Sequence, residues 1–137
     1  KPLPKSLAAM ATAVYEDTLY VFGGIPWSQG PPSQKCYKYI PSLNEWFELP
    51  DLPSIPRGYA VAEVLGDKIY LIGGLSENST TTYNLVEVFD PVAGIWSTEP
   101  VAQMWLYVFG SAERSDLCVW RWYASALLRW FTYGRIL

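Results

Sequence analysis

The residue types that carry most catalytic and metal-binding chemistry are scarce in this chain. It contains no histidine, so no imidazole is present to act as a general base, a general acid or a metal ligand. Its two cysteines, Cys36 and Cys118, are too few for a four-thiolate site or for the disulfide framework of a small secreted module. Cys36 falls in an alternating strand pattern, so we expect a packed apolar group and not a nucleophile. We expect no catalytic residues, no metal and no cofactor.

Length and composition fit one globular domain. Of the 137 residues, 50% are hydrophobic and 17% are charged. The net charge is −3 and no run of Lys and Arg occurs, which argues against a nucleic-acid partner. No segment is long and apolar enough to span a bilayer, and the start, Lys1 to Lys5, opens no signal peptide. We therefore expect a cytoplasmic protein with no membrane partner.

The sequence repeats itself at an interval of 50 residues without a gap. Sliding the chain by this interval pairs Val14 with Val64, Asp17 with Asp67, Tyr20 with Tyr70, Gly23-Gly24 with Gly73-Gly74, Pro41 with Pro91, Trp46 with Trp96 and Pro50 with Pro100. A gapless register that carries two Gly-Gly pairs and two tryptophans is specific. It indicates two copies of one supersecondary unit.

Each unit has the pattern of four short strands. In the first unit the candidate strands cover 9–15, 18–22, 35–40 and a stretch from Glu45, and in the second they lie at 59–65, 68–72, 85–90 and from Ile95. The second strand of each unit is apolar at nearly every position, so it must be covered on both faces. The pattern predicts an all-β fold.

Two kinds of turn are predicted to keep one shape in both units. The Gly-Gly pair after each second strand suits a sharp exit, where a Cβ atom would clash or φ must be positive. Asn44 and Gly94 occupy the same place in the turn before the fourth strand. Because these residue types tolerate left-handed backbone best, we expect that conformation at both.

These features resemble the kelch repeat, in which a strand ending in Gly-Gly is followed by an aromatic residue and then by a tryptophan. The matching residues are Gly23, Gly24, Tyr39 and Trp46 in the first unit and Gly73, Gly74, Phe89 and Trp96 in the second. The resemblance covers about 7–103, within a domain of two kelch repeats at 1–103 with blades at about 7–50 and 57–100. It implies a partial β-propeller of two four-stranded antiparallel blades, with the eight residues serving packing.

The pattern breaks down in residues 104–137, which we interpret as a broken third repeat and a divergent tail. Residues 106–110 repeat 19–23, but Tyr123 and Ala124 stand where a third Gly-Gly pair is expected. The tail is either a physiological variant ending or a product of aberrant splicing, frameshift or gene prediction. We expect it to be irregular or partly helical. A helix at 117–131 would be an interfacial or partner helix, or else an unselected tail that packs poorly.

Two blades are too few to close a propeller, which generally has about four to eight. Each apolar blade face is covered only by its neighbour. We therefore expect a fragment of a longer protein, or a chain that associates with others, and an isolated chain that is prone to aggregate.

The resemblance implies partner binding on a rim formed by loops 25–34, 75–84 and 51–58, where the two units differ most. Arg57 resembles an arginine that many kelch domains present to acidic peptides, and its alternative role is a salt bridge. Tyr59 either flanks it on the rim or packs in the core. Trp27 is an exposed anchor or a loop cap. Asn78 and Tyr83 complete the candidate partner-binding residues, although Asn78-Ser79-Thr80 also fits a glycosylation pattern that we take as coincidental.

The leading functional hypothesis is a protein-binding module. The phrase 56–60, Pro-Arg-Gly-Tyr-Ala, and the strand end 88–91, Val-Phe-Asp-Pro, look like kelch domains of BTB-kelch proteins, which recruit substrates to cullin-RING ubiquitin ligases. The partner would be a protein or peptide, possibly acidic by the resemblance, and cullin would bind only through BTB and BACK domains, which we expect to be absent here. Actin binding or scaffolding stays an alternative. A sugar-converting kelch enzyme is a third, disfavoured because a copper oxidase would need histidine ligands.

Overall fold

The computed structural model describes residues 1–28, 30–75 and 82–98, all within the compact unit Lys1–Val101. Its elements in chain order are β1 (Leu7–Ala8), β2 (Ala11–Tyr15), β3 (Thr18–Phe22), β4 (Ile25–Pro26), β5 (Cys36–Ile40), the 3-10 helix η1 (Pro41–Leu43), β6 (Glu45–Leu49), β7 (Val61–Leu65), β8 (Lys68–Ile72), β9 (Val86–Asp90) and β10 (Ile95–Thr98). The expectations for 104–137 lie outside the described residues.

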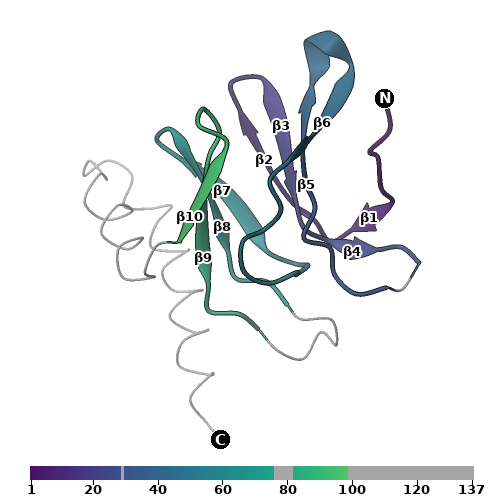
Figure 1. The fold of residues 1–137 in the computed structure, drawn as a ribbon, viewed down its shortest axis with the longest axis vertical. Coiled ribbons are helices and arrows are strands. Elements are labelled where there is room, and N and C mark those ends of the chain that lie inside the picture. Colours follow the sequence, from purple (N-terminus) through teal and green to yellow (C-terminus); the bar gives the residue numbers. More distant parts are fainter. Residues whose placement is uncertain (29, 76–81, 99–137) are drawn as a thin grey trace, which may run out of the picture. The chain divides into compact units, whose positions relative to one another are not determined.

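Two four-stranded antiparallel sheets contain most of these strands and lie side by side (Figure 1). The first sheet has the order β2-β3-β5-β6 and the second the order β7-β8-β9-β10, so each is a simple meander. The innermost strands, β2 and β7, pack against each other. The predicted all-β fold with two four-stranded units is confirmed.

The strand register repeats with the sequence. Tyr20 in β3 pairs with Ala13 on one side and Lys38 on the other, and Tyr70 in β8 has the pairing partners that stand 50 residues later in the chain. A slip of one residue would turn each strand's buried side chains to the opposite face. The sequence period is therefore a period of the three-dimensional structure.

The first strand of each sheet begins two residues later than predicted, at Ala11 and Val61. The reason is the backbone of Ala9 and Tyr59, which have φ angles of 51° and 56°. Left-handed residues cannot continue a β-ladder. Neither alanine nor tyrosine signals this conformation in a sequence, so the prediction placed them in the strands.

The Gly-Gly turn has the same backbone in both units. Gly23 has a φ of 61° and Gly73 a φ of 65°. At Gly23 a Cβ atom would stand 2.5 Å from the carbonyl oxygen of Arg57, in the linker that enters the second sheet. Only glycine leaves room for this approach, and the next main-chain amide, that of Gly24, donates to the same oxygen at 3.0 Å. The linker is thereby held onto the first sheet.

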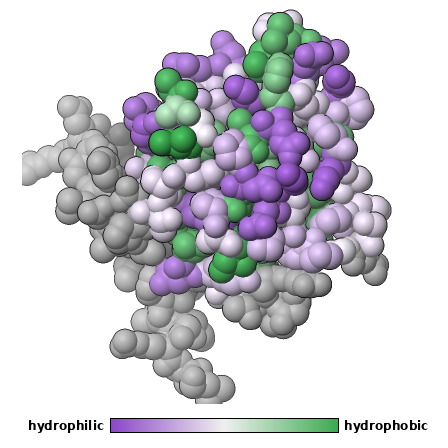
Figure 2. All heavy atoms as spheres, viewed as in Figure 1, coloured by the Kyte–Doolittle hydropathy of each residue, from purple (hydrophilic) through white to green (hydrophobic). Residues whose placement is uncertain are grey.

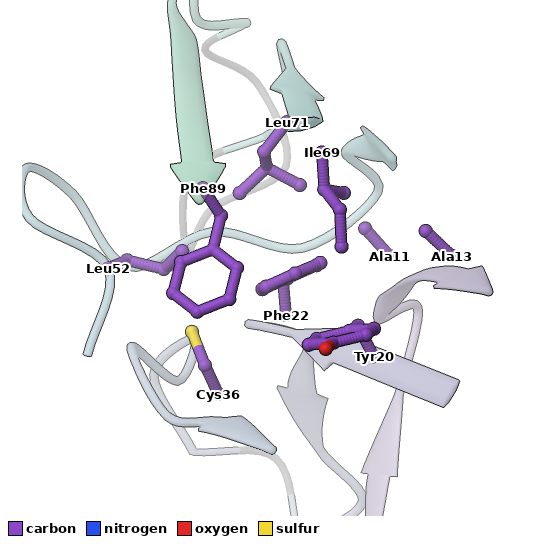
Figure 3. Close-up of a cluster of buried hydrophobic side chains, with 9 residues drawn as sticks. All are labelled: Ala11, Ala13, Tyr20, Phe22, Cys36, Leu52, Ile69, Leu71 and Phe89. Atoms are coloured by element: carbon purple, nitrogen blue, oxygen red, sulfur yellow. The ribbon is translucent and has the colours of Figure 1, made fainter. Parts of the chain in front are cut away.

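An apolar cluster fills the space between the two sheets (Figure 3). Its members are Ala11, Ala13, Tyr20, Phe22 and Cys36 from the first sheet, Leu52 from the linker, and Ile69, Leu71 and Phe89 from the second sheet. The Phe22 ring meets the Phe89 ring at 5.8 Å between centroids in an edge-on arrangement. Small alanines on β2 allow the inner strands to approach, while the aromatic rings fill the wider outer part.

Trp96 connects the second sheet to the first at the outer edge of this cluster. Its ring lies 5.3 Å from that of Phe22 and 5.0 Å from that of Phe89. Its indole nitrogen donates to the carbonyl oxygen of Pro50, at the exit of the first sheet, at 3.1 Å. Trp46 makes the corresponding bond to Lys1 at 2.9 Å. Each tryptophan therefore fastens its sheet to the segment that leads into it.

A buried ion pair ties the linker to the second sheet. Arg57 and Glu87 have fully buried side chains, and the Arg57 Nη2 and Glu87 Oε2 atoms lie 2.5 Å apart. The other Glu87 oxygen accepts bonds from the main-chain amide and the hydroxyl of Ser54, and Arg57 Nη1 donates to the carbonyl of Ile55. Arg57 Nε has no partner among the described atoms. These bonds largely offset the cost of burying both charges.

The first repeat builds the same position without charge. Residues 50 places before Arg57 and Glu87 are Leu7 and Tyr37, and Tyr37 is buried at 3% exposure. The places of the ion pair in the second unit are thus taken by an apolar and an aromatic residue in the first. Replacing both partners of a buried ion pair together is expected to change the free energy of unfolding little.

Substitution of Gly23 by alanine tests the close approach of the linker. We expect Gly23→Ala to lower the free energy of unfolding by at least about 2 kcal/mol, because the left-handed strain of about 1 kcal/mol is joined by the clash with Arg57. The control is Gly94→Ala, at a φ of 69° with no atom near its absent Cβ. Urea unfolding followed by circular dichroism measures both, and equal losses would contradict the clash.

Changing one member of the ion pair should be far more damaging than changing both. Arg57→Leu or Glu87→Tyr alone is expected to cost about 3–5 kcal/mol, because the remaining charge is buried without its partner. The double variant, which copies Leu7 and Tyr37, should recover most of that loss. A double-mutant cycle by urea unfolding measures the coupling, and simple additivity of the two losses would refute this account.

Burial raises the pKa of the Cys36 thiol from 9.0 to about 12. The thiol should therefore resist alkylation by iodoacetamide at pH 8 in the folded chain and react on unfolding in urea, as followed by peptide mass spectrometry. The unfolded chain loses this proton first as the pH rises, so the thiol's contribution to stability is present below pH 9 and lost between pH 9 and 12. Rapid alkylation of the folded chain would contradict the burial.

Candidate functional site

The candidate site is the group of loops at the end of the sheets where β3 and β8 finish. The described parts of the loop between β3 and β5, of the loop between β8 and β9, and of the linker from β6 to β7 lie at this end. A small sheet of β1 and β4 fixes its base through the pairs Leu7–Pro26 and Ala8–Ile25. In the second unit the bridge between Gly58 and Leu75 repeats the second of these pairs. We call the described residues of these three segments, 23–28, 30–35, 50–60, 73–75 and 82–85, the loop rim.

Trp27 follows β4 directly and presents its side chain to solvent. Its side chain is 78% exposed, while its main-chain amide donates to the carbonyl oxygen of Ser6 at 3.1 Å. The far side of the loop is held by a bond of 2.7 Å from the Ser33 amide to the Gly24 carbonyl. Trp27 is therefore an exposed ring on an anchored main chain, and its role as a partner contact stays a prediction.

Tyr59 is the second exposed aromatic residue of the rim, with 59% of its side chain accessible. Its amide donates to the carbonyl oxygen of Ala9 at 2.8 Å. It is not a core residue, so the structure favours the rim over core packing. Its neighbour Gly58 is so close to Ile25 that a Cβ atom would lie 2.7 Å from the Ile25 side chain. Tyr59 therefore lies beside the strand from which Trp27 emerges.

Arg57 does not lie on the surface of the rim. It is 1% exposed and its guanidinium faces Glu87 in the interior, so the salt-bridge alternative matches the geometry and a ligand contact does not. The reason is Glu87, a carboxylate between two buried valines of β9, which requires a buried cation. This acid inside the strand, in contrast to Asp90 at the strand's end, was the signal that could have identified the partner of Arg57.

The last two predicted contact residues belong to the loop after β8. Tyr83 is half-buried, and its amide donates to the Gly74 carbonyl at 3.0 Å, so its main chain is part of the turn. Asn78 lies outside the described residues. Neither its contact role nor its glycosylation pattern is tested here.

Charged side chains among the described residues are paired with one another in several places. On the face seen in Figure 2, apolar residues form separate patches between polar ones. Lys35 pairs with Glu48 and Asp51 at 2.5 and 3.1 Å, and Lys68 pairs with Asp90 at 2.6 Å. Asp90 also accepts the amides of Val92 and Ala93, and these bonds together with Lys68 lower its pKa.

Over 1–28, 30–75 and 82–98, no group of three or more histidine, cysteine or acidic side chains is arranged to hold a metal ion. Over the same ranges, no helix has the length and apolar character needed to cross a membrane.

Comparison with known proteins agrees with the repeat geometry. The family model of the Kelch motif matches residues 6–53 and 56–100. An F-box/kelch-repeat protein of Arabidopsis thaliana is 34% identical over 102 residues, which are 74% of this chain and 26% of that protein. Human Kelch repeat and BTB domain-containing protein 13 is 29% identical over 125 residues, which are 88% of this chain and 26% of that protein.

A solved structure described as that of YjhT has the same fold, with a TM-score of 0.58 at 23% identity, and the match covers 70% of this chain and 28% of that one. The chain spans about a quarter of the length of these two relatives. The two motif matches each contain one of the four-stranded sheets, which are thus kelch blades of a partial β-propeller. The chain therefore belongs to the kelch-repeat family.

Proposed function

We propose that the two blades form part of a protein-binding module whose partner contacts the loop rim. The blades share one register and one set of turn conformations, whereas the loops 25–34 and 75–84 differ in sequence. A constant scaffold that carries variable loops is the usual arrangement of a recognition surface. The family membership supports the same role, since kelch repeats are protein-interaction modules.

The exposure of Trp27 on an anchored main chain is the observation that carries this proposal. Tryptophan and tyrosine dominate the binding energy of protein interfaces because they bury a large area with few rotatable bonds. The bonds of Trp27 to Ser6 and of Ser33 to Gly24 hold the loop before a partner arrives. Binding then requires less ordering of the main chain, which favours affinity.

We further propose that this module selects substrates for a cullin-RING ubiquitin ligase in the cytoplasm. The names of two relatives combine kelch repeats with an F-box and with a BTB domain, which supports an adaptor role for a longer protein. In such a protein the blades would hold the substrate, and BTB and BACK domains would hold the cullin. Cys36 is a free thiol, which is compatible with a reducing compartment. The proposed role is binding, not catalysis.

Removing the Trp27 ring tests the proposed surface. We expect Trp27→Ala to reduce capture of specific partners from cytosolic extract by about tenfold or more, since a hot-spot residue contributes about 2 kcal/mol or more. The matched control is Val92→Ala, because Val92 is 81% exposed in the turn between β9 and β10, at the other end of the sheet. Quantitative mass spectrometry of cross-linked partners gives the readout. Equal capture by both variants would reject the rim as the binding surface.

A further inference from the structure

Resting on the proposed function, we infer that the loop rim binds an extended, proline-containing peptide of low charge, with Tyr59 as a second aromatic contact beside Trp27. Three observations carry this inference: the backbone conformation of Tyr59, the spacing of the two aromatic residues, and the burial of the rim's arginine.

The backbone of Tyr59 is left-handed, with a φ of 56°. A side chain in this conformation brings its Cβ atom close to a carbonyl oxygen, so glycine or asparagine would fit the position better. Ala9, at the same place in the first unit, has a φ of 51°, so the fold imposes the conformation. A tyrosine there, with 59% of its side chain exposed, gains little in folding. The strain is explained if the ring contacts a partner.

The two aromatic residues attach to one short stretch of main chain. The Trp27 amide bonds to Ser6 and the Tyr59 amide bonds to Ala9. Three residues of main chain span at most about 11 Å. One turn of a polyproline II helix covers three residues and about 9 Å, so two prolines one turn apart fall within this limit. Proline-rich segments characteristically bind to exposed aromatic rings.

The charge of the rim favours a ligand of low charge. The Arg57 guanidinium is buried and neutralised by Glu87, so it offers no fork for a carboxylate. Lys5, next to Ser6, is the exposed cation of this stretch. An acidic ligand would therefore depend on Lys5, whereas a proline-containing ligand would depend on the two rings.

Panning a phage-displayed library of random dodecapeptides against the immobilised 137-residue chain tests the ligand class. We expect enrichment of peptides in which prolines or apolar residues recur three positions apart. Trp27→Ala and Tyr59→Ala should each weaken the selected peptides by about tenfold or more, and Lys5→Ala by less than twofold. Enrichment of acidic peptides that depend on Lys5 would overturn the inference.

Variants at the left-handed positions separate strain from binding. Tyr59→Gly should raise the urea midpoint of unfolding and abolish peptide binding, whereas Ala9→Gly should raise the midpoint and leave binding unchanged. Tyr59→Phe should retain binding, since the ring supplies the contact. Unchanged binding by Tyr59→Gly, or no gain in its midpoint, would overturn the role of Tyr59. If Trp27→Ala also retained its partners from extract, the proposed function itself would fail.

Discussion

The packing of one sheet against the other is the constraint on which the rest of the structure depends. Strands β3 and β8 are apolar on both faces, so neither sheet can bury its central strand alone. The side chains at this contact differ in size with the distance between the sheets. Small alanines lie where the strands are closest, and Phe22, Phe89 and Trp96 fill the space where the strands diverge. The packing also requires the linker to pass from one sheet to the other and to be held there by main-chain hydrogen bonds.

The linker shows how a repeat keeps its backbone while its side chains change. Its carbonyl at Arg57 meets the Gly24 amide of the first sheet, and its side chain meets Glu87 of the second. In the first repeat, Leu7 and Tyr37 stand at the places of Arg57 and Glu87. Since the fixed linker also carries Tyr59 and supports the strand before Trp27, the interior bonds determine what the loop rim presents to a partner.

Much of the fold could be predicted because the 50-residue repeat, the Gly-Gly pairs and the tryptophans each depend on local structure that the sequence shows directly. The pairing of Asn44 with Gly94 predicted left-handed backbone, and both residues have it, with φ angles of 51° and 69°. Less of the site could be predicted, since exposure depends on distant partners. The sequence left Arg57 between a ligand contact and a salt bridge because its partner Glu87 is 30 residues away in the chain. Strands β1 and β4 are too short to show a period.

A direct test of the central claim is the contact between the Phe22 and Trp96 rings, whose centroids lie 5.3 Å apart although the residues belong to different repeats. Nuclear Overhauser spectroscopy of the chain in solution measures it. Cross-peaks between the protons of the two rings, together with slow exchange of the Trp96 indole proton, are the predicted result. Sharp, independent signals from the two rings without a cross-peak would show that the sheets do not pack as adjacent blades.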